Sequence, residues 1–159
     1  MAEMTGGQAV VQSLKRYGVD TIFALPGVQN DHLFNALHDE GNSVRVVHTR
    51  HEQGVAYMAY GYAKSTGRAG VYAVVPGPGL LNTTAALSTA YAGNAPVLCV
   101  AGQIRSDLIG RGIGQLHELP DQFAILRGLT KWAGQIDRPS QAEPIVAEAF
   151  RQMMSGRPR

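Results

Sequence analysis

Residues 44–79 decide the fold, and they read VRVVHTRHEQGVAYMAYGYAKSTGRAGVYAVVPGPG. The two ends of this stretch, residues 44–48 and 71–75, are short and mainly apolar, which is typical of strands buried on both faces. Between them, residues 52–66 are long enough for a helix and rich in small side chains, with Gly67 as the expected stop. A strand, a helix and a second strand in this order predict a parallel pair joined by a crossover helix.

The same alternation continues on both sides of this stretch. Further helices are expected over residues 5–17, 31–40, 81–91, about 122–126 and a last segment opened by Ser140. Further strands are expected over residues 21–25, 96–101 and near 131–136. Glu143 follows Ser140 at capping-box spacing, although Pro144 allows that helix to begin a turn later. We therefore predict an α/β fold, a doubly wound and mainly parallel sheet with helices on both faces.

Length and composition exclude several classes of protein. The chain has 159 residues, of which 45% are hydrophobic and 16% charged, and its formal net charge is +2. These values are typical of one folded domain over residues 1–159 and not of a disordered chain. The basic residues are scattered, so no nucleic-acid partner is predicted. No apolar run approaches a membrane span and no signal-peptide pattern opens the chain, so we expect a cytoplasmic protein without a membrane partner.

Three segments directly follow expected strands, and they cover residues 25–28, 48–52 and 76–82. Ligands of open α/β sheets bind at the carboxyl ends of the strands, so these segments predict a ligand site at one edge of the sheet. Glu52, at the start of a helix, is the most informative charge in them. An acidic residue at this position can also serve only to stabilise the helix.

Other motifs in the chain carry weaker signals. The turn Gly77-Pro78-Gly79 offers backbone amides at the start of a helix, as phosphate loops do, but it lacks the Lys-Ser/Thr of a P-loop. A tight turn and a phosphate site therefore both stay open. His48 and His51 have no third ligand at suitable spacing, and Cys99 is the only cysteine, so no metal site is predicted in this chain.

The sequence RHEQGVAYMAYGYAK at residues 50–64 resembles the glutamate helix of thiamine-diphosphate-dependent enzymes. The similarity is to the branch that contains acetolactate synthase, pyruvate oxidase, benzoylformate decarboxylase and oxalyl-CoA decarboxylase. Supporting motifs follow in the family's order: FALPG at 23–27, GPGLLN at 77–82, PVL at 96–98, GQ at 102–103 and TKW at 130–132. By this resemblance the chain is identified as an N-terminal pyrimidine-binding (PYR) domain.

The resemblance implies thiamine diphosphate as the cofactor and Glu52 as the catalytic residue. In the family this glutamate binds N1′ of the aminopyrimidine and promotes removal of the thiazolium C2 proton. The other cofactor-binding residues implied are Pro26, Gly27, Gly77, Pro78, Gly79 and Asn82. On the substrate side the resemblance implies Val28, Gln115 and His117.

The resemblance also implies partners. Family members hold the diphosphate and Mg²⁺ in a separate domain through a Gly-Asp-Gly…Asn motif, and neither this motif nor a central domain occurs in residues 1–159. We expect a fragment or a separately encoded subunit that is inactive alone and is completed by the diphosphate-binding domain of a partner chain. A homodimer or tetramer is expected through PYR-domain helices, with the small-residue helix after Glu52 against its symmetry mate. The expected substrate is a 2-oxo acid or a related acyl donor, and FAD is possible without support from the sequence.

Departures from the family pattern leave the reaction open. Val75-Pro76 stand where relatives often have Thr-Ser or Thr-His, and apolar Val28 stands where decarboxylases often have Asp or Ser. Leu116-His117 stand where synthases usually have Phe-Gln. Two alternatives of other classes remain: a non-catalytic regulatory or interaction domain that kept the fold, and a generic nucleotide-binding α/β module.

Overall fold

The computed structural model describes residues 3–159 and contains the parallel sheet that the sequence predicts. Its four strands, all parallel, lie in the order β2-β1-β3-β4. Their bounds are β1 (Thr21–Ala24), β2 (Arg45–His48), β3 (Gly70–Val74) and β4 (Val97–Ala101). β1 lies between β2 and β3, and all three strands are parallel. The segments that follow them therefore begin at the same edge of the sheet.

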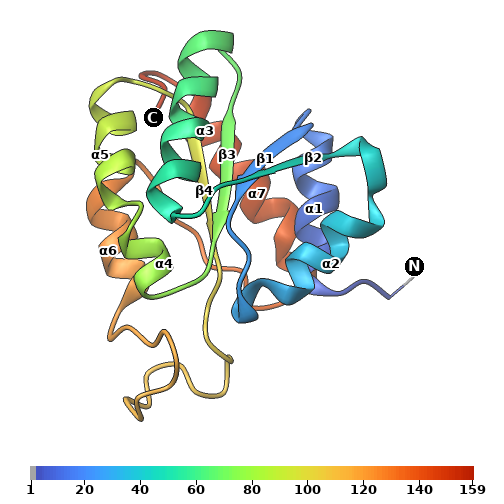
Figure 1. Ribbon diagram of the computed structural model, residues 1–159, viewed down its shortest axis with the longest axis vertical. Coiled ribbons are helices and arrows are strands. Elements are labelled where there is room, and N and C mark those ends of the chain that lie inside the picture. Colours follow the sequence, from blue (N-terminus) through green and yellow to red (C-terminus); the bar gives the residue numbers. More distant parts are fainter. Residues whose placement is uncertain (1–2) are drawn as a thin grey trace.

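Helices cover both faces of the sheet, as Figure 1 shows. On one side lie α1 (Gly6–Arg16), α2 (Asp31–Asp39) and α7 (Ala142–Met154). On the other side lie α3 (Glu52–Thr66), α4 (Pro78–Leu81), α5 (Thr84–Ala92) and α6 (Gln122–Leu129). Three single 3₁₀ turns complete the structure: η1 (Val28–Asn30), η2 (Gly41–Ser43) and η3 (Pro139–Gln141). The doubly wound α/β prediction is confirmed. No helix in residues 3–159 is long and apolar enough to cross a bilayer.

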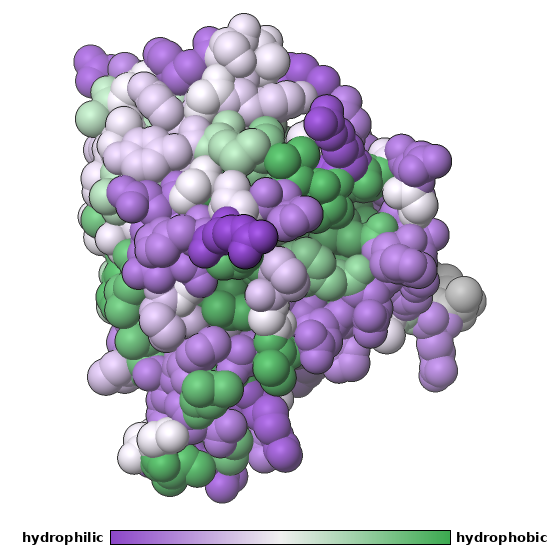
Figure 2. All heavy atoms as spheres, in the orientation of Figure 1, coloured by the Kyte–Doolittle hydropathy of each residue, from purple (hydrophilic) through white to green (hydrophobic). Residues whose placement is uncertain are grey.

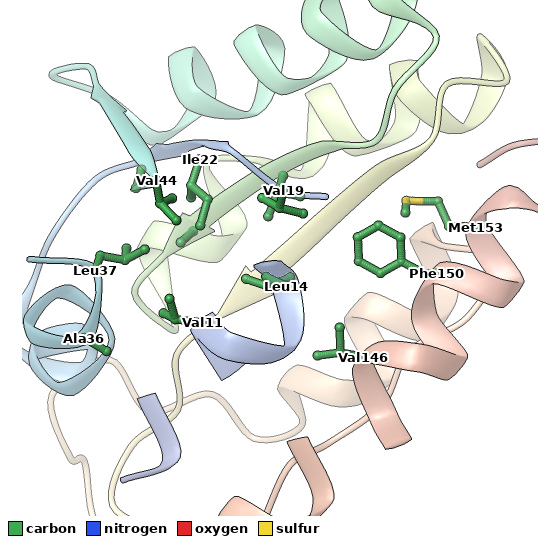
Figure 3. Close-up of a cluster of buried hydrophobic side chains, with 13 residues drawn as sticks. Val11, Leu14, Val19, Ile22, Ala36, Leu37, Val44, Val146, Phe150 and Met153 are labelled. Atoms are coloured by element: carbon green, nitrogen blue, oxygen red, sulfur yellow. The ribbon is translucent and has the colours of Figure 1, made fainter. Parts of the chain in front are cut away.

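The main core lies between the sheet and the face covered by α1, α2 and α7. Figure 3 shows its side chains converging from these helices onto β1, with Leu14 of α1 near the centre. Leu14 is only 1% exposed, and burying a leucine side chain stabilises a fold by roughly 1.5–3 kcal/mol. The helix that carries it begins with a capping box, in which Thr5 and Gln8 each bind the other's backbone N–H.

Small residues let α3 pack closely on the sheet within this chain. Ala56, Ala59 and Ala63 are all buried, and a Cβ on Gly70 of β3 would collide with the backbone of Ala59. These alanines meet β3 and α5 of the same chain, so only the opposite side of α3 is left for the contact with a symmetry mate that the sequence predicts. Tyr57 and Met58 remain on the outer side, each more than one-third exposed.

Two predicted helices differ in their limits. The helix expected over residues 81–91 is two helices, α4 and α5, with a break at Asn82 and Thr83. The backbone N–H of Thr83 donates to the carbonyl of Leu80, three residues earlier instead of four, and the Thr83 hydroxyl donates to the same carbonyl. At the other end, Ser140 lies in η3 and does not cap α7, so the capping-box prediction is wrong. The helix begins at Ala142 with Gln141 as its N-cap, one residue later than a Ser140 cap would give and less than the full turn that Pro144 suggested.

The predicted strand near residues 131–136 is absent from the described part of the chain. These residues and the outer edge of β4 line the same apolar cavity of roughly 430 Å³, so the segment does not reach β4 to pair with it. At the start of this segment, the Lys131 ammonium donates to the carbonyls of Ser155 and Arg157, which follow α7. β3 has a neighbour on each side and is buried throughout, whereas β4 pairs only with β3 and is half-buried along its length.

Candidate functional site

The candidate site lies where β1, β2 and β3 end. The register pairs Ala24 of β1 with His48 of β2 and with Ala73 of β3, so the chain leaves these strands at nearly the same level. The loop of residues 102–121, which follows β4, extends beyond this edge at the bottom of Figure 1. In parallel sheets, this edge is where loops and helix starts are free to form a ligand site.

Glu52 is the first residue of α3, and two side chains fix the start of that helix. His51 is the N-cap: its Nδ1 accepts a hydrogen bond from the backbone N–H of Gln53 at 3.2 Å. The hydroxyl of Thr49 donates to the carbonyl of His51 at 2.7 Å. Capping satisfies one of the free N–H groups of the helix and holds its first turn in place. The Glu52 carboxylate is thereby held, half-buried, at the positive end of the helix.

Asn82 binds the Glu52 carboxylate directly. Its Nδ2 donates to Oε2 of Glu52 at 2.9 Å. Asn82 can do this because it lies at the break between α4 and α5, where it is the C-cap of α4. The other carboxylate oxygen, Oε1, has no hydrogen-bond partner within residues 3–159 and faces Gly79, where a Cβ would lie 3.6 Å from it. One oxygen is thus held by Asn82, and the other is available to a ligand.

Two glycines surround Val75 next to this carboxylate. A Cβ on Gly27 would lie 2.5 Å from Cγ1 of Val75, and a Cβ on Gly79 would lie 2.5 Å from Cγ2. Both distances are too short for any real side chain, so these two positions require glycine as long as Val75 is present. Pro26, which precedes Gly27, is exposed. The backbone of these two glycines, here called the bare glycine surface, lies against buried Val75 near Glu52 and carries no side chain.

The turn Gly77-Pro78-Gly79 is built for close approach, and it is a poor phosphate loop. Gly77 has φ +61°, which favours glycine, and its N–H donates to Oε1 of Gln122 at 3.2 Å. Pro78 has no N–H, and α4 is only four residues long. Gln122 also donates through Nε2 to the carbonyl of Gly102 at 2.8 Å, so it ties the turn to the end of β4. These contacts favour the tight-turn interpretation over a nucleotide-binding module.

The three residues expected on the substrate side lie at the same edge but not in contact with Glu52. Val28 is 71% exposed in η1. His117 lies in the loop of residues 102–121 at φ +69°, and its carbonyl oxygen would be 2.6 Å from a Cβ on Gly77. Gln115 lies in the same loop, where its N–H donates to the carboxylate of Glu118. His117 is therefore next to the glycine turn, whereas no side-chain contact joins Gln115 to it.

Exposed apolar side chains surround this edge. Ile113 and Leu116 of the loop are 62% and 58% exposed, and Val28 is more exposed still. Figure 2 shows apolar side chains among polar ones at the loop end of the molecule. Large exposed apolar residues that gather at one end indicate a surface that another molecule or domain covers.

The residues present fit an aminopyrimidine. A half-buried carboxylate with one available oxygen can accept a hydrogen from a ring nitrogen or donate one to it, depending on its own protonation. The bare glycine surface, which carries no side chain, suits the flat face of an aromatic ring. By contrast, no group of three or more His, Cys, Asp or Glu side chains in residues 3–159 is arranged to hold a metal ion.

Fold and site together define a cofactor-binding α/β domain with a carboxylate at a helix start. A family model described as the N-terminal TPP binding domain of thiamine pyrophosphate enzymes matches residues 4–125. The chain belongs to this family. The family assignment made from the sequence is confirmed.

Curated relatives support the same assignment. The chain is 41% identical over 156 residues to a probable 2-ketoarginine decarboxylase of Pseudomonas aeruginosa, covering 98% of the chain and 28% of that relative. It is 39% identical over 157 residues to an acetolactate synthase of Arthrospira platensis, covering 98% and 27%. It is 37% identical over 155 residues to the acetolactate synthase large subunit of Lactococcus lactis, covering 97% and 26%. The chain thus spans about a quarter of the length of these relatives.

Sequence reasoning missed four residues that shape the site. Val75 was noted only as a departure from the family pattern, yet it fixes the need for Gly27 and Gly79. The sequence excludes His51 as part of a metal site but does not show that its side chain caps α3. Gln29 and Gln122 carry no signal in the sequence, because their partners are 20 to 88 residues away along the chain.

Proposed function

We propose that this PYR domain activates thiamine diphosphate through Glu52 in an enzyme that decarboxylates a 2-oxo acid or joins its acyl unit to a second carbonyl compound. The observation that carries the proposal is the Glu52 carboxylate itself. Asn82 binds one of its oxygens, and the other faces a bare glycine surface. A carboxylate used only to stabilise a helix needs neither feature.

The role proposed for Glu52 is to exchange a proton with the ring nitrogen N1′. The carboxylate is held at a fixed helix start, half-buried and oriented by an amide, so it can carry this proton without moving a helix or a strand. When bound, thiamine diphosphate supplies the group that accepts electrons released from the substrate's carbonyl carbon. Gly27, Gly79 and Asn82 line the cofactor in this proposal, with Pro26, Gly77 and Pro78 around them.

The substrate class rests on the relatives and on the edge of the site. The name of the Pseudomonas aeruginosa relative specifies a 2-oxo acid and a decarboxylation. Here we propose a 2-oxo acid as well, with Val28 and His117 on the side where it reacts. Val28 provides an apolar contact, and His117, whose backbone is in close contact with Gly77 of the glycine turn, provides a titratable side chain.

A second domain completes the site in this proposal. It holds the diphosphate and Mg²⁺, and it covers the exposed apolar side chains Val28, Ile113 and Leu116. A partner chain supplies this domain, so the enzyme acts as a homodimer or a larger assembly. The length of the relatives, about four times that of the matched part, supports the presence of such further domains.

The proposal is tested with the complete enzyme that contains this chain. Release of CO₂ from 2-ketoarginine, pyruvate and other 2-oxo acids is measured with and without thiamine diphosphate and Mg²⁺. We expect CO₂ release from at least one of these acids, and this release should require thiamine diphosphate. Binding of the cofactor by calorimetry without turnover of any 2-oxo acid or acyl donor would instead support the non-catalytic alternative, and absence of binding would contradict the proposal.

A further inference from the structure

Gln29 joins two parts of the candidate site that are far apart in the sequence. It lies in η1, two residues after Gly27, and its side chain reaches the loop of residues 102–121. Its Nε2 donates to the carbonyl of Leu116 at 3.2 Å, and its Oε1 lies 3.0 Å from Nδ1 of His117. A single amide therefore holds both the backbone and the side chain of consecutive loop residues.

The first of these contacts determines the second. A carbonyl oxygen can only accept a hydrogen bond, so the NH₂ group of Gln29 must face Leu116. The oxygen of the same amide then faces His117, and it too can only accept. Nδ1 of His117 must therefore carry a hydrogen, and the imidazole is fixed in one orientation and one tautomer.

The backbone of His117 is fixed independently. The residue has φ +69°, a conformation that few residues other than glycine adopt, and its carbonyl is in close contact with Gly77. With Nδ1 bound to Gln29, the uncharged ring offers Nε2 as an acceptor, and the charged ring offers Nε2–H as a donor. Nε2 has no hydrogen-bond partner among residues 3–159.

We propose that Gln29 is a positioning residue that selects the Nδ1–H tautomer of His117 and presents Nε2 to the substrate. This inference rests on the proposed function, because it takes the substrate to be a 2-oxo acid with a carboxylate and a carbonyl oxygen. Nε2–H of the charged ring can donate to either of these oxygens, whereas Nε2 of the uncharged ring can only accept a hydrogen. The Gln29 side chain makes no hydrogen bond to Glu52 or to its partner Asn82.

The test reads the tautomer directly, by nitrogen NMR of the histidine rings in the 159-residue chain without cofactor. Five histidines are present, and His117→Gln identifies the signals of this one. Gln29→Met keeps the length of the side chain and removes both hydrogen bonds, and Gln29→Ala is a second variant in case methionine repacks. Gln135→Met is the matched control, because Gln135 is exposed and binds only Asp137.

We expect Nδ1 to be the protonated nitrogen of the neutral ring in the wild-type chain and in Gln135→Met. In both Gln29 variants the proton should move largely to Nε2. An unchanged tautomer in the two variants, or an Nε2–H ring in the wild type, overturns the inference.

A second readout uses the complete enzyme. Gln29→Met should lower kcat/KM for its 2-oxo acid roughly tenfold, as the loss of a ring-orienting partner typically does, and leave the affinity for thiamine diphosphate unchanged. An unchanged kcat/KM contradicts a role of the tautomer in substrate handling. Failure of the wild-type enzyme to use any 2-oxo acid refutes the proposed function instead, and the NMR result still decides whether Gln29 sets the tautomer.

Discussion

Asn82 at the end of α4 donates a 2.9 Å hydrogen bond to Glu52 at the start of α3, so two residues 30 positions apart in the sequence meet at one carboxylate. The contact exists because the chain breaks between α4 and α5 instead of forming one helix. It fixes which carboxylate oxygen is occupied and which one faces the bare glycine surface. The geometry of the site therefore depends on this pair more than on any single residue.

Replacing Asn82 by alanine should weaken the function of Glu52 without removing it. A hydrogen bond to a charged group contributes about 1.5 kcal/mol at a partly exposed site, which corresponds to roughly a tenfold loss in kcat/KM. Steady-state kinetics of the complete enzyme measure this loss. Asn42→Ala is the matched control, because Asn42 is exposed in η2. Equal kinetics for the two variants would mean that the contact has no role in activation.

Gly79→Ala should destabilise the domain through a collision with one identified side chain. The new Cβ would lie 2.5 Å from Cγ2 of Val75, and overpacking of this kind costs about 1–3 kcal/mol. In a Val75→Ala background that methyl group is absent, so the same glycine substitution should cost less than about 0.5 kcal/mol. Urea denaturation of the wild type, the two single variants and the double variant gives the free energy of unfolding of each chain. Equal costs in the two backgrounds would show that Val75 is not the reason for glycine at this position.

Cys99 should be unreactive at ordinary pH, although it lies on a strand with an open edge. Burial raises the pKa of its thiol to about 12, because the side chain packs against the core cluster beneath β4. At pH 8 the thiolate fraction is then on the order of one in ten thousand, and alkylation by iodoacetamide should be roughly a thousandfold slower than for a free cysteine. The chain unfolded in guanidinium chloride is the control and should react at the ordinary rate.

The same pKa has a consequence for stability at high pH. The thiol ionises near pH 9.0 in the unfolded chain and near pH 12 in the folded one, so the unfolded state loses its proton first. Stability should therefore fall as pH rises between these values, and less so in Cys99→Ala. A free-energy difference between the two chains that does not change with pH would contradict the raised pKa.

Local patterns were sufficient to predict the parallel α/β fold and the position of Glu52. The signals used for this prediction are local: each can be identified within a few positions of the sequence. They are short apolar runs, helix stops such as Gly67 and the residues that follow each strand. The predicted strand near residues 131–136 failed because a strand also needs a paired neighbour, and this segment lies across a cavity from β4. The break at Asn82 was missed because the contacts of Thr83 with Leu80 and with buried Tyr72 outweigh the helical pattern around it.

The parts of the site that no local pattern predicts are contacts between distant segments. Gln122 reaches the turn at Gly77 from 45 residues away, and Gln29 reaches His117 from 88 residues away. Glutamines are common on protein surfaces, so neither residue differs from others in the sequence until the fold brings its partner close. The resemblance to a known family supplied Asn82 and His117 as candidates, and the structure shows which side chains hold them.

The most direct test of the central claim is the exchange of the C2 proton of bound thiamine diphosphate with deuterium, measured in Glu52→Gln. Glutamine keeps the size of the side chain but cannot carry a proton, so we expect exchange at least a hundredfold slower than in the wild-type enzyme. Glu143→Gln, an exposed glutamate in the first turn of α7, is the control and should exchange at the wild-type rate. Exchange at the wild-type rate in Glu52→Gln, with the cofactor bound, would contradict the role proposed for this carboxylate.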